Sequence, residues 1–181
     1  MPLNDAVELD VTRIRQLLTE LDAQLVAKGI EAKLFIVGGA AMALAYNARR
    51  VTADIDGIFV PRDVVLDAAE AVAAAHRLPK HWLSDGVSQL MPGRDDDHPR
   101  SETIGRALTI EIASPQYLLA MKAMSSRQSQ GDLDDAALLC KQLGITKESG
   151  IEELVGRYFG NSIVGAQELF FERIIDRAAT R

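Results

Sequence analysis

The sequence predicts an α/β (α+β) fold: a small mixed β-sheet core flanked by helices, with a helical C-terminal part. Three observations predict it. Short apolar runs lie at residues 33–37, 54–60 and 107–112, and the first two end at a double glycine and at a proline. Segments in which apolar residues recur at helical spacing separate these runs. After the third run, only helical patterns follow.

The first predicted helix covers residues 8–28, because apolar residues from Leu9 onward recur at helical spacing and Gly29 ends the pattern. The run 33–37 is short and continuously apolar, which is typical of a buried strand. Residues 40–47 contain good helix formers, so the chain is expected to return to helix there.

The second predicted strand, 54–60, leads into an alanine-rich helix over residues 62–76, with Asp63 as its N-cap. Residues 79–106 contain three prolines and three glycines and are predicted to be the least regular part. We expect one short helix within this part and a mobile tip at 93–100.

The run 107–112 alternates apolar and polar residues and predicts the third strand. The next helix begins with Ser114 as N-cap and a proline at its first position. A further helix ends at Gly144, and the segments 146–160 and 162–181 are predicted to finish the chain as helices. We therefore expect a core with its N-terminal helix over residues 1–145 and a helical appendage over 146–181.

Composition narrows the class of protein. Hydrophobic residues make up 48% and charged residues 25%, as in ordinary globular proteins. The net charge of −6 argues against a surface that grips a long nucleic acid. No apolar run approaches a membrane span, no secretory signal pattern is present, and the single cysteine, Cys140, lies in an apolar helical pattern. These features predict a cytoplasmic protein with a buried, inert thiol.

Asp54 and Asp56 lie one residue apart at the start of the second strand. Alternate strand residues share a face, so the two side chains are expected side by side, roughly 6–7 Å apart at the backbone. Ile55 then points into the core. Paired carboxylates repel unless a cation lies between them, and Mg²⁺ is often held by one or two carboxylates together with substrate phosphates. A solvated start of a strand is the alternative reading of the same pattern.

Gly38 and Gly39 lie between a buried strand and the start of a helix. Glycine permits positive φ and close approach of a ligand, and the amides of a helix start favour anions. The pair therefore predicts a phosphate-binding turn, although close packing of helix on strand would also require small residues. The pattern is neither a P-loop nor a dinucleotide-binding turn.

Together these residues resemble a known family. "FIVGGAAMALAYNARRVTADIDGIF" is similar to the signature of the DNA polymerase β-like nucleotidyltransferase superfamily, in which Gly-Gly or Gly-Ser precedes Asp-x-Asp on the next strand. The form R-x-T-x-D-I-D resembles minimal nucleotidyltransferases of the AbiEii/MenT type, the toxins of bacterial toxin–antitoxin pairs. "SPQYLLAMKAMSSRQSQGDLDDAALLCKQLG" resembles a later helical motif of the same proteins. The resemblance covers roughly residues 30 to 145.

The resemblance implies roles for ten residues. Those implied to be catalytic are Asp54, Asp56, Lys122 and Asp135, of which the first two would hold Mg²⁺ and Lys122 would lie near the phosphates. Those implied to bind substrate are Gly38, Gly39, Arg50, Thr52, Arg127 and Asp132. Alternatives read from the residues alone stay open: Lys122 as a solvated helix lysine, and Arg127 with Asp132 as a salt bridge or cap.

Two positions depart from the family pattern. Many members carry a third carboxylate on a later strand, and Glu111 is the candidate here; it is either that third metal ligand or an exposed strand residue. Gly57 follows the aspartate pair where an apolar residue is commoner, so it either loosens the strand or gives the substrate room.

The implied activity is Mg²⁺-dependent transfer of a nucleoside monophosphate from an NTP to an acceptor, with a tRNA 3′ end as the acceptor and a cognate antitoxin as partner. Arg49, Arg50 and Arg127 are the first candidates for an RNA contact, and the alternative for Arg49 and Arg50 is that they are solvated surface arginines. Transfer to a protein or a small molecule is the alternative within enzymes, and a non-catalytic nucleotide-binding module is the alternative outside them.

Overall fold

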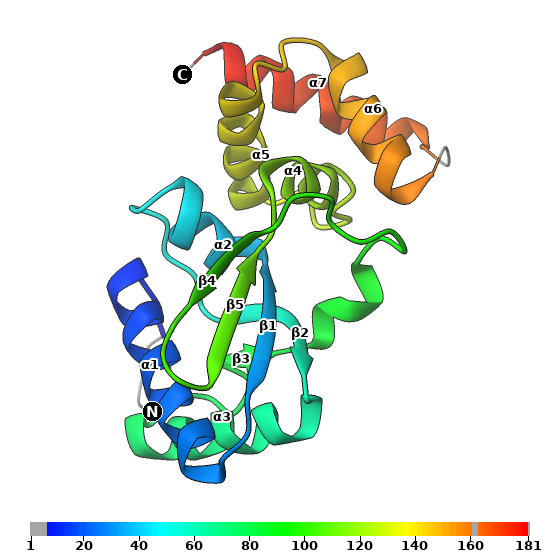
Figure 1. Ribbon diagram of the computed structural model, residues 1–181. Coiled ribbons are helices and arrows are strands. Elements are labelled where there is room, and N and C mark those ends of the chain that lie inside the picture. Colours follow the sequence, from blue (N-terminus) through cyan, green and yellow to red (C-terminus); the bar gives the residue numbers. More distant parts are fainter. Residues whose placement is uncertain (1–6, 161–162, 181) are drawn as a thin grey trace. The chain divides into compact units, whose positions relative to one another are not determined.

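The computed structural model describes residues 7–160 and 163–180 of the chain (Figure 1). These residues form a mixed α/β structure that divides into two compact units. The first unit comprises the residues up to Gln89 together with Pro99–Ala113, and the second comprises Leu90–His98 and the residues from Ser114 onward. The division expected between residues 145 and 146 falls inside the second unit.

The first unit is built on a mixed sheet, which in the described residues has five strands in the order β3-β2-β1-β5-β4. The strands are β1 Ala32–Val37, β2 Ile55–Val60, β3 Leu83–Ser84, β4 Arg100–Thr103 and β5 Leu108–Ile112. The central strand β1 is antiparallel to β2 and parallel to β5. The three predicted strands are thereby confirmed. The segment 79–106 contains the predicted short helix, which is the 3₁₀ helix η2, Gly86–Leu90. It is more regular than predicted because it also supplies the two edge strands.

Helices α1 (Val11–Lys28) and α3 (Arg62–His76) pack together against one face of this sheet. Asp10 caps α1 by accepting a hydrogen bond from the Arg13 amide at 2.7 Å. The predicted start at residue 8 is therefore wrong. Leu9 pairs in antiparallel fashion with Thr52 instead. Asp63 is also not an N-cap: Pro61 occupies that position, and Asp63 lies in the first turn of α3.

The sheet has one buried face and one open face. Alternate residues such as Leu34, Ile55 and Ile110 are fully buried on the side of α1 and α3. The residues between them point to the opposite side, which we call the open face. It carries Lys33, Phe35, Asp56, Ile58, Val60, Thr109 and Glu111, all of which are partly or fully exposed.

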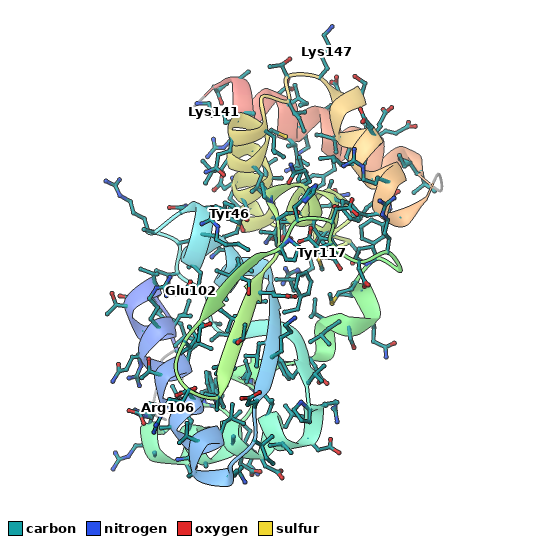
Figure 2. The ribbon with its side chains drawn as sticks, in the orientation of Figure 1. Tyr46, Glu102, Arg106, Tyr117, Lys141 and Lys147 are labelled. Carbon is teal, nitrogen blue, oxygen red and sulfur yellow. The ribbon has the colours of Figure 1, made fainter. Side chains whose placement is uncertain are left out.

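The segment after β1 forms the short helix α2 (Gly38–Ala41) and the π-helix η1 (Met42–Tyr46), so the helix predicted over 40–47 is present in two pieces. The hydroxyl of Tyr46, labelled in Figure 2, donates to the carbonyl of Ala113 at 2.7 Å. The Arg100 guanidinium lies 5.8 Å from the centre of the Tyr46 ring. These contacts fix the end of η1 beside the end of β5.

The second unit consists mainly of four helices in its described residues: α4 Pro115–Ala123, α5 Gln130–Leu143, α6 Glu148–Phe159 and α7 Gly165–Ala179. Ser114 caps α4 as predicted, by accepting from the Tyr117 amide. Cys140 is buried, and this burial raises the pKa of its thiol to about 12, as expected of an inert cysteine. The last helix was predicted over 162–181, of which Ser162 and Arg181 lie outside the described residues.

Across the described parts of both units, we find no helix with the length and apolar character required to cross a membrane.

Candidate active site

Asp54 and Asp56 flank the buried first residue of strand β2. Strand β2 begins at Ile55, so Asp54 precedes the strand by one residue and Asp56 is its second residue. Ile55 is fully buried, whereas both aspartates are partly exposed. The Ile55 amide donates to the Trp82 carbonyl at 2.7 Å, and Trp82 is itself fully buried. Burial and this hydrogen bond therefore fix the position of Ile55, the residue between the two aspartates.

Gly38 brings the backbone turn to Asp56. Val37 pairs with Asp56 in the register of β1 and β2, and Gly38 follows with a φ of +64°. A Cβ atom built on Gly38 would lie 3.7 Å from Asp56 Oδ2. The turn that follows β1 is therefore adjacent to a carboxylate of the pair, and its left-handed backbone favours glycine.

Gly39 faces the segment that precedes the aspartates. A Cβ atom built on Gly39 would lie 2.8 Å from Thr52 Oγ1 and 3.5 Å from Arg50 Nη2. The first distance is shorter than an ordinary contact, so Thr52 or the turn would have to shift, and close packing favours glycine here. The structure thus brings Gly38, Gly39, Arg50, Thr52 and Asp56 together in the first unit, at the end of β1.

Hydrogen bonds hold the segment that carries Arg50 and Thr52. The Leu9 amide donates to the Thr52 carbonyl at 2.7 Å, and the Thr52 amide donates back to Leu9 at 3.1 Å. The Thr52 hydroxyl donates to the Asp54 carbonyl at 3.2 Å, and the Arg50 guanidinium donates to the Val51 carbonyl. Leu9 is therefore a supporting residue that the sequence did not indicate. The one feature of the sequence that could have indicated this role is that Leu9 is an apolar residue directly before the helix cap Asp10.

Glu111 lies on the open face, in register with Phe35. Its carboxylate oxygen is 2.7 Å from Lys33 Nζ. Within residues 7–160 and 163–180, no three His, Cys, Asp or Glu side chains are grouped so that they could hold a metal ion. Asp54 and Asp56 carry carboxylates, which are hard oxygen donors of the kind that Mg²⁺ prefers, and their role as its ligands stays a prediction. A role for Glu111 as third ligand stays a prediction.

The packing of strand β2 against β1 explains why residue 57 is a glycine. A Cβ atom at this position would lie 2.2 Å from the carbonyl oxygen of Phe35 on β1. Its position is on the buried side of the sheet, between Asp56 and Ile58. Glycine here is required by the close approach of two strands.

The remaining predicted residues form a cluster in the second unit. Lys122 is only 7% exposed, which excludes a solvated helix lysine. Its ammonium nitrogen lies 3.0 Å from Asp132 Oδ1 and 2.9 Å from Asp135 Oδ2. Arg127 is largely exposed, and its Nη2 lies 3.4 Å from Asp132 Oδ1. The salt bridge between Arg127 and Asp132 is thereby present.

Asp132 is the centre of this cluster. Its carboxylate accepts a hydrogen bond from the Ser125 hydroxyl at 2.9 Å. It also forms a capping box with Ser129 at the start of α5. Burial alone would raise the pKa of Asp132. The charge of Lys122 and hydrogen bonds from Lys122, Ser129 and Ser125 outweigh burial and lower the pKa to about 2. Asp132 is therefore a buried carboxylate that stays ionised.

One comparison with known families finds a match. The model of a family described as "Nucleotidyltransferase of unknown function (DUF6036)" matches residues 12–147. This range begins within α1 and ends after α5, so it contains every residue of the two clusters above except Leu9. Comparisons with curated proteins and with solved structures gave no match.

Proposed function

The chain belongs to the nucleotidyltransferase family DUF6036, and we propose that it uses Mg²⁺ to transfer a nucleoside monophosphate from an NTP to an acceptor hydroxyl. The observation that carries this proposal is the adjacency of the glycine turn and the aspartate pair, with Gly38 next to the Asp56 carboxylate. A glycine turn that admits phosphates, beside carboxylates that suit a metal ion, fits the needs of this reaction.

In the proposed reaction, the acceptor oxygen bonds to the α-phosphorus of the NTP. The bond from that phosphorus to the bridging oxygen breaks, pyrophosphate leaves, and the hydroxyl proton passes to water. A bound Mg²⁺ would supply positive charge to the phosphate oxygens. Asp54 and Asp56 would hold that ion, and the backbone at Gly38 and Gly39 would approach the triphosphate. Arg50 lies beside Gly39, which supports a contact with the phosphates.

The second cluster has two proposed roles. The resemblance to AbiEii/MenT-type proteins implies that Lys122 acts near the phosphates, with Asp135, Asp132 and Arg127 at the edge of the site. The two ion pairs of Lys122 support a role in stabilising the second unit. A kinetic and a stability measurement on Lys122 variants, described in the Discussion, separate the two roles.

For the acceptor, we propose an RNA 3′ end, such as that of tRNA, with this chain acting in the cytoplasm as the toxin of a toxin–antitoxin pair. The support is the resemblance of the R-x-T-x-D-I-D form to AbiEii/MenT-type toxins. The net charge of −6 favours a short RNA contact over an extended one.

The test is incubation of the protein with total tRNA, Mg²⁺ and each labelled NTP, in parallel with total cell protein as acceptor. The account predicts label on tRNA from at least one NTP and no label with Asp54→Ala. Label on protein alone would reject the RNA acceptor but keep nucleotidyl transfer. Absence of label on either acceptor, with NTP binding intact, would favour a small-molecule acceptor or a binding module.

A further inference from the structure

The open face of the sheet continues from the aspartate pair along β1 and β2. Ile58 is two residues beyond Asp56 on β2 and lies on the same face, paired with Phe35 of β1. Val60 follows, again on this face. Ile58 is 41% exposed and Val60 62% exposed. A strip of apolar surface therefore begins directly beside the proposed reaction centre.

The strip ends in a hollow of about 490 Å³ at the far end of the sheet, whose lining includes Lys33, Val60, Thr103, Arg106 and Thr109. Figure 2 labels Arg106 at this end and Tyr46 near the other. Val60 is four residues beyond Asp56, or roughly 13 Å at about 3.3 Å per strand residue. One ligand that reaches both places must therefore extend over about this length.

The chemistry of the strip fits single-stranded RNA. The half-buried ring of Phe35 offers a surface on which a base can stack, and the exposed side chains of Ile58 and Val60 offer apolar contacts to a base. The exposed cations Lys33 and Arg106 suit phosphates. The hydroxyls of Thr103 and Thr109 suit 2′-hydroxyl groups. Lys33 is paired with Glu111, but the pair is partly exposed and its lysine mostly so, which makes it weak enough to exchange for a phosphate. A polypeptide fits less well, because peptides commonly add to the edge of a sheet or fill a groove.

We propose that the open face, from Asp56 to the hollow at Lys33 and Arg106, binds a short single-stranded RNA segment whose 3′ end is the acceptor. This inference rests on the proposed function and adds the surface that selects the acceptor. It also accounts for RNA recognition by an acidic protein, since only a few phosphates are contacted.

The test measures RNA binding without turnover. The probe is a short 5′-fluorescein single-stranded RNA with a free 3′ hydroxyl, titrated by anisotropy in the absence of NTP. Ile58→Ser and Arg106→Glu should each weaken binding by about tenfold, since apolar contacts to a base and contacts to phosphates both contribute. Arg106→Ala should lower the slope of log affinity against log salt by about 1.

Matched controls are Leu169→Ser and Lys147→Glu, which make comparable changes at exposed positions of the second unit. The controls should bind RNA like the wild type, and all variants should keep their melting temperatures and their affinity for a fluorescent NTP analogue. Equal RNA affinity in Ile58→Ser, Arg106→Glu and the wild type would overturn the inference, as would an equal loss in the controls.

Two further outcomes separate this inference from the proposed function. Transfer of nucleotide to total protein, with no RNA bound, would overturn the RNA surface and leave nucleotidyl transfer standing. RNA binding that depends on Ile58 and Arg106, in a protein that binds no NTP, would support the surface and overturn the proposed function.

Discussion

The backbone of Gly38 lies against the carboxylate of Asp56, such that a Cβ atom on Gly38 would be 3.7 Å from Asp56 Oδ2. This relationship joins two short motifs that are 18 positions apart in the sequence. It arises because Val37 and Asp56 pair in an antiparallel register, so that the end of β1 meets the start of β2. A nucleotide whose phosphates approached the turn would place them beside the proposed metal ligands.

Gly39→Ala tests the turn. The new Cβ would lie 2.8 Å from Thr52 Oγ1, so either the turn or the Thr52 segment must shift. Because small misplacements near the reacting groups are costly, we expect kcat/KM for the NTP to fall by about 10²-fold. Gly93→Ala is the control, since nothing lies within 4 Å of a Cβ there. Equal kcat/KM in both variants and the wild type would remove Gly39 from the site.

Gly57→Ala tests packing and not catalysis. A Cβ atom would lie 2.2 Å from the Phe35 carbonyl oxygen, and a backbone atom cannot swing away as a side chain can. We expect a loss of about 1–3 kcal/mol in the free energy of unfolding, as for other overpacked cores. A urea titration measures it. A urea midpoint equal to that of the wild type would contradict this, because it would mean that β1 and β2 can move apart with no loss in the free energy of unfolding.

Lys122→Met tests the second cluster. The variant leaves the carboxylates of Asp132 and Asp135 without their buried cation. Breaking a buried ion pair by removing one partner typically costs about 3–5 kcal/mol, so the melting temperature should fall clearly. Exposed Lys141→Met is the matched control.

The double variant Lys122→Met/Asp132→Asn separates the two roles of Lys122. If the role is structural, the second change should restore part of the lost stability and part of the activity. If Lys122 contacts the phosphates, the apparent KM for the NTP should stay raised even when stability returns. Unchanged stability and unchanged kinetics in Lys122→Met would exclude both roles.

The lowered pKa of Asp132 predicts how stability depends on pH. The unfolded carboxyl titrates near its ordinary 3.8 and the folded one near about 2, so the unfolded state binds more protons between these values. The contribution of Asp132 is therefore complete above about pH 5 and is lost as pH falls towards 2. The lowering of its pKa from 3.8 to about 2 corresponds to roughly 2–3 kcal/mol, at about 1.4 kcal/mol for each pKa unit. The difference in unfolding free energy between wild type and Asp132→Asn should shrink over this range. A difference that stays constant from pH 7 to pH 2.5 would contradict it.

Local patterns were sufficient for much of the fold. The strands at 33–37, 54–60 and 107–112 are buried on at least one side, and this burial requires apolar residues that can be recognised in the sequence. Strand β4 was missed because Arg100–Thr103 is polar and mostly exposed at the sheet's edge, and β3 because it has only two residues. Both depend on pairing with distant residues, to which sequence periodicity is insensitive.

In the candidate site, too, some features could be predicted from local sequence and others depend on contacts between distant residues. Asp54, Asp56 and the glycines are recognisable because their spacing on strand and turn is itself the signal. The bridge between Leu9 and Thr52 joins segments far apart in the chain, and no local pattern indicates it. The burial of Lys122 had a signal, since this lysine stands within the apolar stretch LLAMKAM. The identity of its two carboxylate partners depends on how α4 packs against α5.

We propose that Asp54 and Asp56 support transfer of the nucleotidyl group of an NTP, which carries the α-phosphorus. The most direct measurement compares NTP labelled at the α-phosphorus with NTP labelled at the γ-phosphorus, on total tRNA in Mg²⁺, for wild type and Asp56→Asn. We predict α-label on the acceptor, γ-label only in released pyrophosphate, and a loss of about 10²–10⁴-fold in Asp56→Asn without a change in melting temperature. Transfer of γ-label to the acceptor, or α-label transferred equally well by Asp56→Asn, would contradict the account.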